Sequence, residues 1–553
     1  VLKLRELLNM KVTEYITNKG KKYGVKHFMG IPGDFAIPFF AEMDTIGIEP
    51  IIFAHEPSLG YAADAYARIN GLAVIFVTYG AGGLNTLNSI AQAYAENSPV
   101  IVISGAPELD TQRRDLLVHH KVKSFKTQLN VYEEVTCIAK QIDNMETALL
   151  TIDEVFETVK KESKPGYIEI PRDLIKTIIP EKIIKHDFKS FPKKHKINKA
   201  LKEVQEELLK KLKQSKSPVI LAGNEIARKG LKQQLTDLVN KYKIPTMTTM
   251  SGKGVLDETN PYCIGTYMGE MGDLETFDAL KNADLILILG TRETDMDTGL
   301  FSARADQSAI VHAVNDELKV GFHKYSKVTL DDLLVILNSI EPNNTWENPI
   351  QIVEQQPVFN QQGVITTNNT IDLVNHLSIE NDLRFILDVG DMMFNSVRIK
   401  TNDIISPSYY ASMGFAIPAS IASTLSDSIK RTIVFVGDGA FQMTGLELGV
   451  IKRYHLNPII VLMNNSRYET MCVIDENRKI YDTPILDYCL IAEAAGIYSE
   501  RVDDIASLQE AIEKALAYNE ATFIEATVSR ETKSETSIKL RKTIKHKMEE
   551  SLI

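Results

Sequence analysis

The sequence predicts an α/β protein with three open parallel-sheet domains. Short apolar, β-branched runs such as Leu72–Thr78 and Pro218–Ala222 alternate with longer amphipathic segments along the 553 residues. Runs of this kind are typical of parallel strands that are buried on both faces and separated by helices. Two stretches interrupt the alternation, Lys176–Lys199, rich in Lys and Pro, and Glu341–Gly363, rich in Pro, Asn and Gln. We interpret both as linkers that divide the chain into three units of ordinary domain size.

Each unit carries its own predicted elements. In the first we expect a small-residue helix and three strands, at Gly60–Arg68, Ile51–Phe53, Leu72–Thr78 and Val100–Ser104. In the middle unit we expect strands at Pro218–Ala222 and Leu285–Leu289. In the third we expect two strands with a helix between them, at Thr432–Val436, Phe441–Tyr454 and Ile459–Met463. Helical patterns are also expected at the two ends of the sequence, at Leu2–Leu8 and in residues 536–553.

The first and third units share a weak internal repeat. In both, a strand runs into a glycine turn, a helix follows, and the next strand begins with a proline, Pro99 or Pro458. The two turns are Gly80-Ala-Gly-Gly and Gly437-Asp-Gly-Ala. Unrelated α/β sheets can converge on such a pattern, so the repeat alone only suggests that the two units are related.

Composition and charge narrow the class of protein. Hydrophobic residues make up 44% and charged residues 24%, a balance typical of globular proteins. With 62 Lys and Arg against 73 Asp and Glu, the net charge is -11, so we expect neither a nucleic-acid nor a membrane partner. The four cysteines lie far apart without zinc-site spacing, which favours reduced thiols in a cytoplasmic protein. The sequence shows neither a signal-peptide pattern nor a run of membrane-spanning length.

The clearest chemical signal is the turn Gly437-Asp438-Gly439, which is followed one strand later by Asn464-Asn465. Glycines let the backbone approach phosphate oxygens, and the start of the next helix offers free N–H groups to an anion. Asp438 and Asn465 both follow strand ends, where ligands collect in open α/β sheets. They would present hard oxygen ligands of the kind that Mg²⁺ takes when it bridges a protein and a diphosphate. An ordinary Asp-Gly turn without a ligand is the alternative.

These residues, preceded by Gly414 and Pro418, resemble the signature of thiamine-diphosphate enzymes. The resemblance covers about residues 3–530 and is closest to the 2-oxo acid decarboxylases that act on pyruvate, indolepyruvate or phenylpyruvate. It implies thiamine diphosphate and Mg²⁺ as cofactors. It also implies a pyrimidine-binding domain, a middle domain, a diphosphate-binding domain and a tail helix, placed here at residues 1–178, 195–342, 362–535 and 536–553.

The same resemblance implies the residues that hold the cofactors. Asp438, Asn465 and the backbone carbonyl of Arg467 match the metal ligands. Met413 matches a large apolar side chain that bends the cofactor, and Ala411 matches the residue whose carbonyl holds the pyrimidine amino group. Further cofactor contacts are expected at Thr78, Gly80, Asp391, Gly437, Gly439 and Ala440. An isolated Met would otherwise be interpreted as core filling.

Glu56 is the candidate activating carboxylate. It follows the strand Ile51–Phe53 and opens a small-residue helix, where a Glu is usually only a favourable dipole contact. The segment His55-Glu-Pro-Ser-Leu-Gly-Tyr-Ala-Ala-Asp64, however, resembles the family segment whose glutamate hydrogen-bonds the pyrimidine ring of the cofactor. The resemblance therefore implies that Glu56 both binds and activates the cofactor.

The adjacent pair His119-His120 resembles a pair that the decarboxylase subgroup carries at this place and that carboligating relatives generally lack. Histidines titrate near neutral pH and suit proton delivery after CO₂ leaves. Asp34, in Gly30-Ile-Pro-Gly-Asp34, matches the acidic partner of the pair, although an Asp after Pro-Gly is ordinarily a turn residue. We expect catalytic roles for all three side chains.

One position departs from the family pattern. Pyruvate decarboxylases carry a catalytic Glu where this sequence has Met471. The local segment is more similar to the phenylpyruvate branch, in which a middle-domain Asp takes over; Asp295 matches that residue and Glu469 is a second candidate. The departure favours a 2-oxo acid larger than pyruvate.

The expected reaction is the non-oxidative decarboxylation of a 2-oxo acid to an aldehyde and CO₂. A carboligase of the acetolactate synthase type is the nearest alternative. A binding protein that keeps the fold without the chemistry is a second, although Glu56 and Asp438 are both present. A nicotinamide oxidoreductase is a third, but no complete GxGxxG with a later acidic residue accompanies Gly80. We expect no nucleotide in the middle domain, and a homodimer or homotetramer, because relatives form the cofactor site between two chains.

Overall fold

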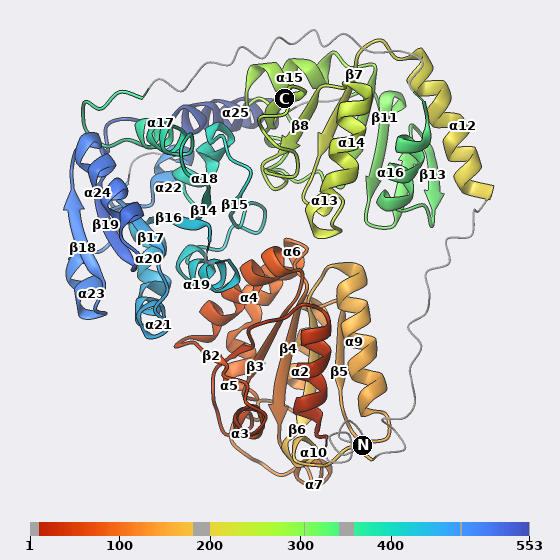
Figure 1. Ribbon diagram of the computed structural model, residues 1–553, viewed down its shortest axis with the longest axis vertical. Helices are drawn as coiled ribbons and strands as arrows, with labels where there is room; N and C mark the ends of the chain where they lie inside the picture. The colour runs from red at the N-terminus through yellow and green to blue at the C-terminus, as the bar shows by residue number, and fades with distance from the viewer. Residues whose placement is uncertain are drawn as a thin grey trace.

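The computed structural model describes residues 10–180, 199–302, 305–341, 359–427, 429–475 and 478–551. The chain folds into three α/β bodies, each built on its own sheet (Figure 1). The two six-stranded sheets are wholly parallel and the seven-stranded middle sheet is mostly parallel, which confirms the predicted fold class. Both predicted linkers lie largely outside the described residues, as does the predicted helix at Leu2–Leu8, and the domain boundaries stay predictions.

The first sheet has the strand order β2-β1-β3-β4-β6-β5. Its strands are β1 (Met29–Gly30), β2 (Ile51–Ile52), β3 (Ala73–Val77), β4 (Val100–Ala106), β5 (Ile138–Gln141) and β6 (Gly166–Pro171). The helices of this domain are α2 (Val12–Lys22), α3 (Ile37–Thr45), α4 (Glu56–Asn70), α5 (Ala81–Asn85), α6 (Leu87–Ala95), α7 (Leu109–Arg113), α8 (Thr127–Val135), α9 (Ala148–Glu162) and α10 (Arg172–Ile175). β3 and β4 are buried at every position, as expected of central parallel strands.

The third sheet repeats the topology of the first. Its strand order is β15-β14-β16-β17-β19-β18. If the strands of each sheet are counted along the chain, the first and third sheets have the same spatial order. The strands are β14 (Leu383–Leu387), β15 (Ile404–Ile405), β16 (Arg431–Gly437), β17 (Ile459–Asn464), β18 (Tyr498–Val502) and β19 (Thr522–Thr527). The helices are α17 (Thr367–Leu377), α18 (Asp391–Phe394), α19 (Ala416–Ser426), α20 (Asp438–Thr444), α21 (Leu448–Arg453), α22 (Glu469–Ile474), α23 (Tyr488–Ala494), α24 (Ile505–Ala517) and α25 (Glu535–Ser551). The repeat noted in the sequence is therefore a repeat of structure.

The middle sheet differs from a purely parallel sheet at one edge. Its order is β13-β12-β11-β10-β7-β8-β9, and β12 runs antiparallel to both of its neighbours. The strands are β7 (Pro218–Ala222), β8 (Thr246–Thr249), β9 (Cys263–Tyr267), β10 (Leu285–Leu289), β11 (Ile310–Val314), β12 (Glu317–Val320) and β13 (His323–Ser326). Only two residues, Asn315 and Asp316, join β11 to β12, and a connection this short can join only antiparallel strands. The helices are α12 (Lys199–Gln214), α13 (Glu225–Arg228), α14 (Lys232–Tyr242), α15 (Leu274–Lys281) and α16 (Leu330–Ser339).

One predicted helix is interrupted. The segment predicted as a single helix at Phe441–Tyr454 forms α20, a 3₁₀ turn at Gly445–Glu447, and α21. The break lies where the ring of Phe441 packs against Gly445, 2.6 Å from the place that a Cβ would occupy. The prediction was wrong because the Phe441 ring is placed by packing against the distant rings of Tyr488 and Phe523, which local periodicity does not show.

The first and third domains pack through helices of small residues. α4 lies against α19, and both are rich in buried small residues, chiefly alanine in α4 and alanine and serine in α19 (Figure 1). Polar contacts support the packing: the Arg68 guanidinium donates to the carbonyl of Ser406 at 2.7 Å, and the Tyr454 hydroxyl accepts from the amide of Ile52 at 2.8 Å. Among the described helices none combines the length and apolarity needed to cross a membrane.

Candidate active site

A cavity of about 570 Å³ opens at the carboxyl edge of the third sheet. Its walls include the turn at Gly437, the loop at Asn465 and the segment that carries Met413. Of the predicted cofactor and metal residues, the cavity is lined by Asp391, Ala411, Met413, Gly437, Asp438, Gly439, Ala440, Asn465 and Arg467. Residues far apart in the sequence thus converge where ligands collect in sheets of this type.

The glycine turn places Asp438 at the end of β16. Because Gly437 pairs with Met463 in the parallel ladder, Asp438 and Asn465 leave neighbouring strands at the same edge. Asp438 is 1% exposed and accepts a hydrogen bond from the Thr483 hydroxyl. Burial raises the pKa of its carboxyl, despite the hydrogen bonds that it accepts. A Cβ at Gly437 would meet nothing within 4 Å, so the turn leaves open space beside a buried carboxylate.

Asn465 and Arg467 complete an oxygen-rich loop. The Asn465 side-chain amide donates to Glu469 at 3.3 Å, while its oxygen accepts from the Arg467 amide at 3.2 Å. Arg467 and Asp482 form an isolated antiparallel β-bridge, but its two backbone hydrogen bonds are made by their neighbours Ser466 and Tyr468. The backbone carbonyl of Arg467 takes no part in these two bonds. A carboxylate, an amide oxygen and a backbone carbonyl are a donor set that fits Mg²⁺.

Asp388 is a site residue that sequence analysis missed. It is fully buried at the end of β14, and its carboxylate accepts from the amides of Gly414 at 3.0 Å and Ala416 at 2.7 Å. These bonds hold the start of α19 and the segment of Met413, and burial raises the pKa of Asp388 to about 6. An acidic residue directly after an apolar strand was a signal that could have found it.

Two further residues of the cavity wall, Ala411 and Asp391, are distinguished by their backbone conformation and by their hydrogen bonds. Ala411 has φ 58°, a left-handed conformation that is unfavourable for a residue with a Cβ and that needs support from its neighbours. Asp391 accepts hydrogen bonds from the hydroxyls of Ser534 and Ser537, both at 2.6 Å. The tail helix α25 is therefore attached to the cavity wall.

In the first domain Glu56 begins α4, where the helix dipole favours a carboxylate. The Asn85 side-chain amide donates to Glu56 Oε2 at 2.8 Å. A Cβ at Gly82 would lie 3.3 Å from Glu56 Oε1, so the glycine turn of this domain packs directly against the carboxylate.

Asp34, His119 and His120 come together, as predicted. The Nε2 of His119 lies 2.5 Å from Asp34 Oδ2. One carboxylate oxygen of Asp34 and one ring nitrogen of each histidine all lie within 4.8 Å of one another. Burial raises the pKa of Asp34, but the hydrogen bond and charge of His119 outweigh it, so the net pKa is below the usual value. The Thr78 hydroxyl donates to Asp34 Oδ1 at 3.3 Å, and Gly80 gives His120 room, because a Cβ there would overlap its side chain.

A single chain does not bring these two groups together. None of the first-domain residues Glu56, Asp34, His119, His120, Thr78 and Gly80 lines the cavity of the third domain. Figure 1 shows α7, which precedes the histidines, at the far end of the first domain from α20 and α22. Asp295 does not line the cavity either, although its neighbour Met296 does.

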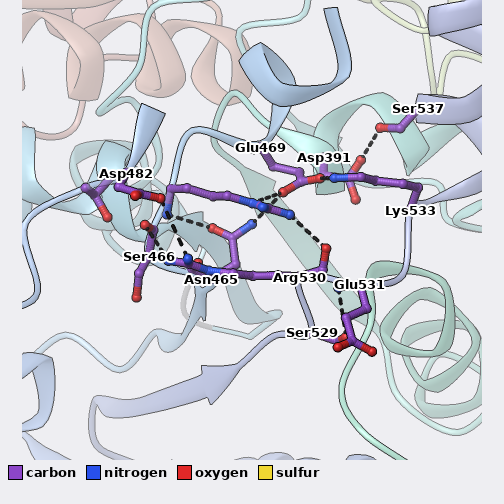
Figure 2. A network of polar contacts seen from close by, with 12 residues as sticks. Asp391, Asn465, Ser466, Glu469, Asp482, Ser529, Arg530, Glu531, Lys533 and Ser537 are labelled. Carbon is purple, nitrogen blue, oxygen red and sulfur yellow. Dashed lines mark hydrogen bonds and ion pairs between the residues drawn. The ribbon is translucent and has the colours of Figure 1, made fainter. Parts of the chain in front are cut away.

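Glu469 and Met471, on α22, both line the cavity. The Glu469 carboxylate is paired with Arg467 at 2.6 Å and with Lys533 (Figure 2). Met471 is 42% exposed and offers an apolar surface at this wall.

Comparison with known proteins finds matches in each of the three domains. Three family models match: the N-terminal TPP binding domain of thiamine pyrophosphate enzymes at residues 10–130, the central domain at 205–330 and the C-terminal TPP binding domain at 388–526. The indole-3-pyruvate decarboxylase of Azospirillum brasilense is 32% identical over 539 residues, covering 95% of this chain and 97% of the relative. The chain belongs to the thiamine-diphosphate-dependent 2-oxo acid decarboxylases. Similar pyruvate decarboxylases occur in Hanseniaspora uvarum, at 30% identity, and in Saccharomyces cerevisiae (isozyme 1), at 29%; each alignment covers 82% of this chain and 83% of the relative.

This membership confirms the resemblance found in the sequence, and with it the prediction of an enzyme that uses thiamine diphosphate. The two thiamine-binding domains of this decarboxylase coincide with the first and third sheets, which share one topology. The nicotinamide-oxidoreductase alternative is thereby set aside.

Proposed function

We propose that this decarboxylase converts a 2-oxo acid larger than pyruvate, of the aromatic or branched-chain type, to the corresponding aldehyde and CO₂. The observation that carries the proposal is the apolar cavity wall at Met471, where the resemblance to pyruvate decarboxylases calls for a Glu. Met443 and Ile474 extend this apolar wall. Such a wall favours a large apolar side chain on the substrate over a methyl group.

In this proposal Asp438, Asn465 and the carbonyl of Arg467 would hold Mg²⁺. When bound, thiamine diphosphate supplies a nucleophilic carbon and an electron sink for the cleavage. Glu56 would hold the pyrimidine ring through its carboxylate, while Asp388 and Ala411 fix the segment that carries Met413. The apolar walls exclude water from the substrate carboxylate, which favours its departure as neutral CO₂.

Proton transfer belongs to Asp34, His119 and His120. The hydrogen bond between Asp34 and His119 fixes the orientation of the imidazole ring. Of the two carboxylates considered for the role of the absent Glu, we favour Asp295. Glu469 is already paired with two cations, whereas Asp295 is exposed in the loop beside Met296.

The complete site requires a second copy of the chain. Eight large apolar side chains of the third domain are exposed and are here called the apolar patch: Met443, Leu446, Met471, Ile474, Ile480, Ile485, Leu486 and Leu490. The Gln442 amide donates to the carbonyl of Pro484 at 3.2 Å, so the segment with the last four lies beside α20. Three of the patch residues also line the cavity, so the patch continues into the site. We propose that the first domain of a partner covers it and brings Glu56 to the cavity, in a homodimer or homotetramer.

Leu446→Asp tests the assembly. Leu446 is 83% exposed, so the change should leave the chain folded but place a charge in the proposed interface. We expect sedimentation at micromolar concentration to shift toward the monomer and activity to fall by at least about tenfold. Val335→Asp, at a 66% exposed position on α16 of the middle domain, is the matched control and should change neither. A monomeric wild type with full activity would refute the two-chain site.

A substrate panel tests the reaction. The protein is incubated with thiamine diphosphate, Mg²⁺ and, separately, pyruvate, a branched-chain 2-oxo acid, phenylpyruvate and indolepyruvate, and aldehyde and CO₂ are measured. We expect kcat/KM for the best of the larger acids to exceed that for pyruvate by at least about tenfold. Met471→Glu should reduce this preference, whereas Ile379→Glu, at an exposed position outside the cavity lining, should not.

The products decide between the remaining alternatives. Acyloin as the main product would support a carboligase of the acetolactate synthase type. A clear preference for pyruvate would contradict the proposal that the apolar wall at Met471 favours a larger substrate.

A further inference from the structure

The segment of residues 529–534, here called the strap, joins β19 to α25 and crosses the loop of Asn465 (Figure 2). Within the strap, Arg530 donates from Nε to the backbone carbonyl of Asn465 at 2.6 Å and from a terminal guanidinium nitrogen to the carbonyl of Ser466 at 2.9 Å. One side chain therefore holds two consecutive carbonyls of the loop that carries the proposed metal ligands.

The loop holds the strap in return. The guanidinium of Arg467, whose residue is 6% exposed, donates to the carbonyl of Arg530 at 2.8 Å and to Glu469 Oε2 at 2.6 Å. A buried cation requires such partners, because it has lost its hydration. Lys533, also from the strap, pairs with the other oxygen of Glu469. Glu469 thus joins the loop and the strap with both oxygens.

The other end of the strap is attached to the cavity wall. Ser534 and Ser537 both donate to Asp391, and the Asn395 side-chain amide donates to Ser534 Oγ at 2.8 Å. Arg530 and Lys533 themselves do not line the cavity, although Ser529 and Thr532 do. The two cations therefore do not contact the cavity, and they act on a bound metal through the loop that they hold and, for Arg530, through a charge that reaches Asp438.

The loop needs such support for a physical reason. Ser466 has φ 54°, a left-handed conformation that costs energy in a residue with a Cβ and that persists only when the surroundings hold it. Mg²⁺ demands near-ideal octahedral geometry at about 2.0–2.1 Å, so small shifts of a carbonyl or amide ligand weaken its binding. The turn at Ser466 lies between Asn465 and Arg467, the two proposed ligands that the loop provides.

We propose that Arg530 and Lys533 are positioning residues, which hold the loop of residues 465–467 in the conformation that binds Mg²⁺. Arg530 fixes the backbone carbonyls, and Lys533 fixes Glu469 and, through it, the Asn465 amide and the Arg467 guanidinium. The inference rests on the proposed metal site, and it deepens that proposal by giving the strap a part in the site.

The test measures Mg²⁺ binding rather than turnover. Titration calorimetry of the full chain with Mg²⁺, at saturating thiamine diphosphate, compares the wild type with Arg530→Ala, Arg530→Lys and Lys533→Ala. Loss of an outer contact of this kind typically weakens metal affinity about 10–100-fold, which we expect for Arg530→Ala. Arg530→Lys should recover part of the loss, because an ammonium can still donate to one of the two carbonyls. Arg453→Ala is the control, since Arg453 is an exposed arginine of the same domain, on α21, whose guanidinium lies over the ring of Tyr454 rather than against the loop.

Amide hydrogen exchange supplies a second readout. The Thr483 amide donates to the carbonyl of Ser466 at 3.1 Å, so it should exchange faster in Arg530→Ala if the loop loosens, and at the wild-type rate in Arg453→Ala. Wild-type affinity and exchange in both Arg530→Ala and Lys533→Ala would overturn the inference while leaving the metal site intact. A wild type whose thiamine diphosphate binding is independent of Mg²⁺ would overturn both together. If Arg530→Ala does not fold, Arg530→Lys and Lys533→Ala decide the question in the same way.

Discussion

Replacing Glu56 with glutamine is expected to lower kcat by about 10²–10⁴-fold, the range that a positioned acid–base group usually contributes. Glutamine keeps the shape of the side chain and an oxygen that can accept from Asn85, so the start of α4 should remain intact. It removes the carboxylate that, in our proposal, holds and activates the pyrimidine ring. Steady-state kinetics at saturating thiamine diphosphate and Mg²⁺ measure the loss, and circular dichroism checks the fold.

Glu49→Gln is the matched control for this change, because Glu49 is an exposed glutamate of the same domain, outside both groups of site residues. Near-normal turnover of Glu56→Gln would show that Glu56 is only a helix-start residue. If Glu56→Gln loses activity because it unfolds, a second variant, Glu56→Asp, tests the role of the carboxylate. This change keeps the negative charge but shortens the side chain.

Replacing Asp438 with asparagine is expected to weaken Mg²⁺ binding by at least about 100-fold, because a hard divalent cation loses its charged ligand. The carboxylate is buried and its pKa is raised, so removing its charge should not destabilise the fold, and asparagine can still accept from Thr483. Activity should fall in parallel and recover partly at high Mg²⁺. Calorimetric titration with Mg²⁺ in the presence of thiamine diphosphate measures the affinity.

Asp503→Asn serves as the control for Asp438→Asn, since Asp503 is an exposed carboxylate of the same domain that lies outside the cavity. Unchanged Mg²⁺ affinity in Asp438→Asn would mean that the metal, if it binds, is held elsewhere. Loss of activity with intact Mg²⁺ affinity would give Asp438 a role in orienting the diphosphate instead.

Much of the fold followed from local patterns. The predicted strands Pro218–Ala222 and Leu285–Leu289 match β7 and β10 residue for residue, because a short apolar run bounded by polar residues suits a central parallel strand. The predicted turn and strand ends brought Asp438 and Asn465 to one cavity. The antiparallel edge of the middle sheet and the break at Gly445 were not predicted, since they depend on a tight connection and on a buried ring contact.

The sequence by itself determined the α/β class, the family, and the residue types at each strand end, because strand periodicity and turn chemistry act over a few neighbouring residues. Only the tertiary structure decided which of those residues meet. Asp388 supports the segment of Met413, and Arg530 reaches the carbonyls of Asn465 and Ser466, through contacts between residues far apart in the chain. Such contacts leave no periodic trace in the sequence, since they depend on where the packed sheets and α25 place each side chain. For the same reason, only the structure showed that one chain keeps the Glu56 group away from the cavity, whereas the two-chain site was already expected from the family resemblance.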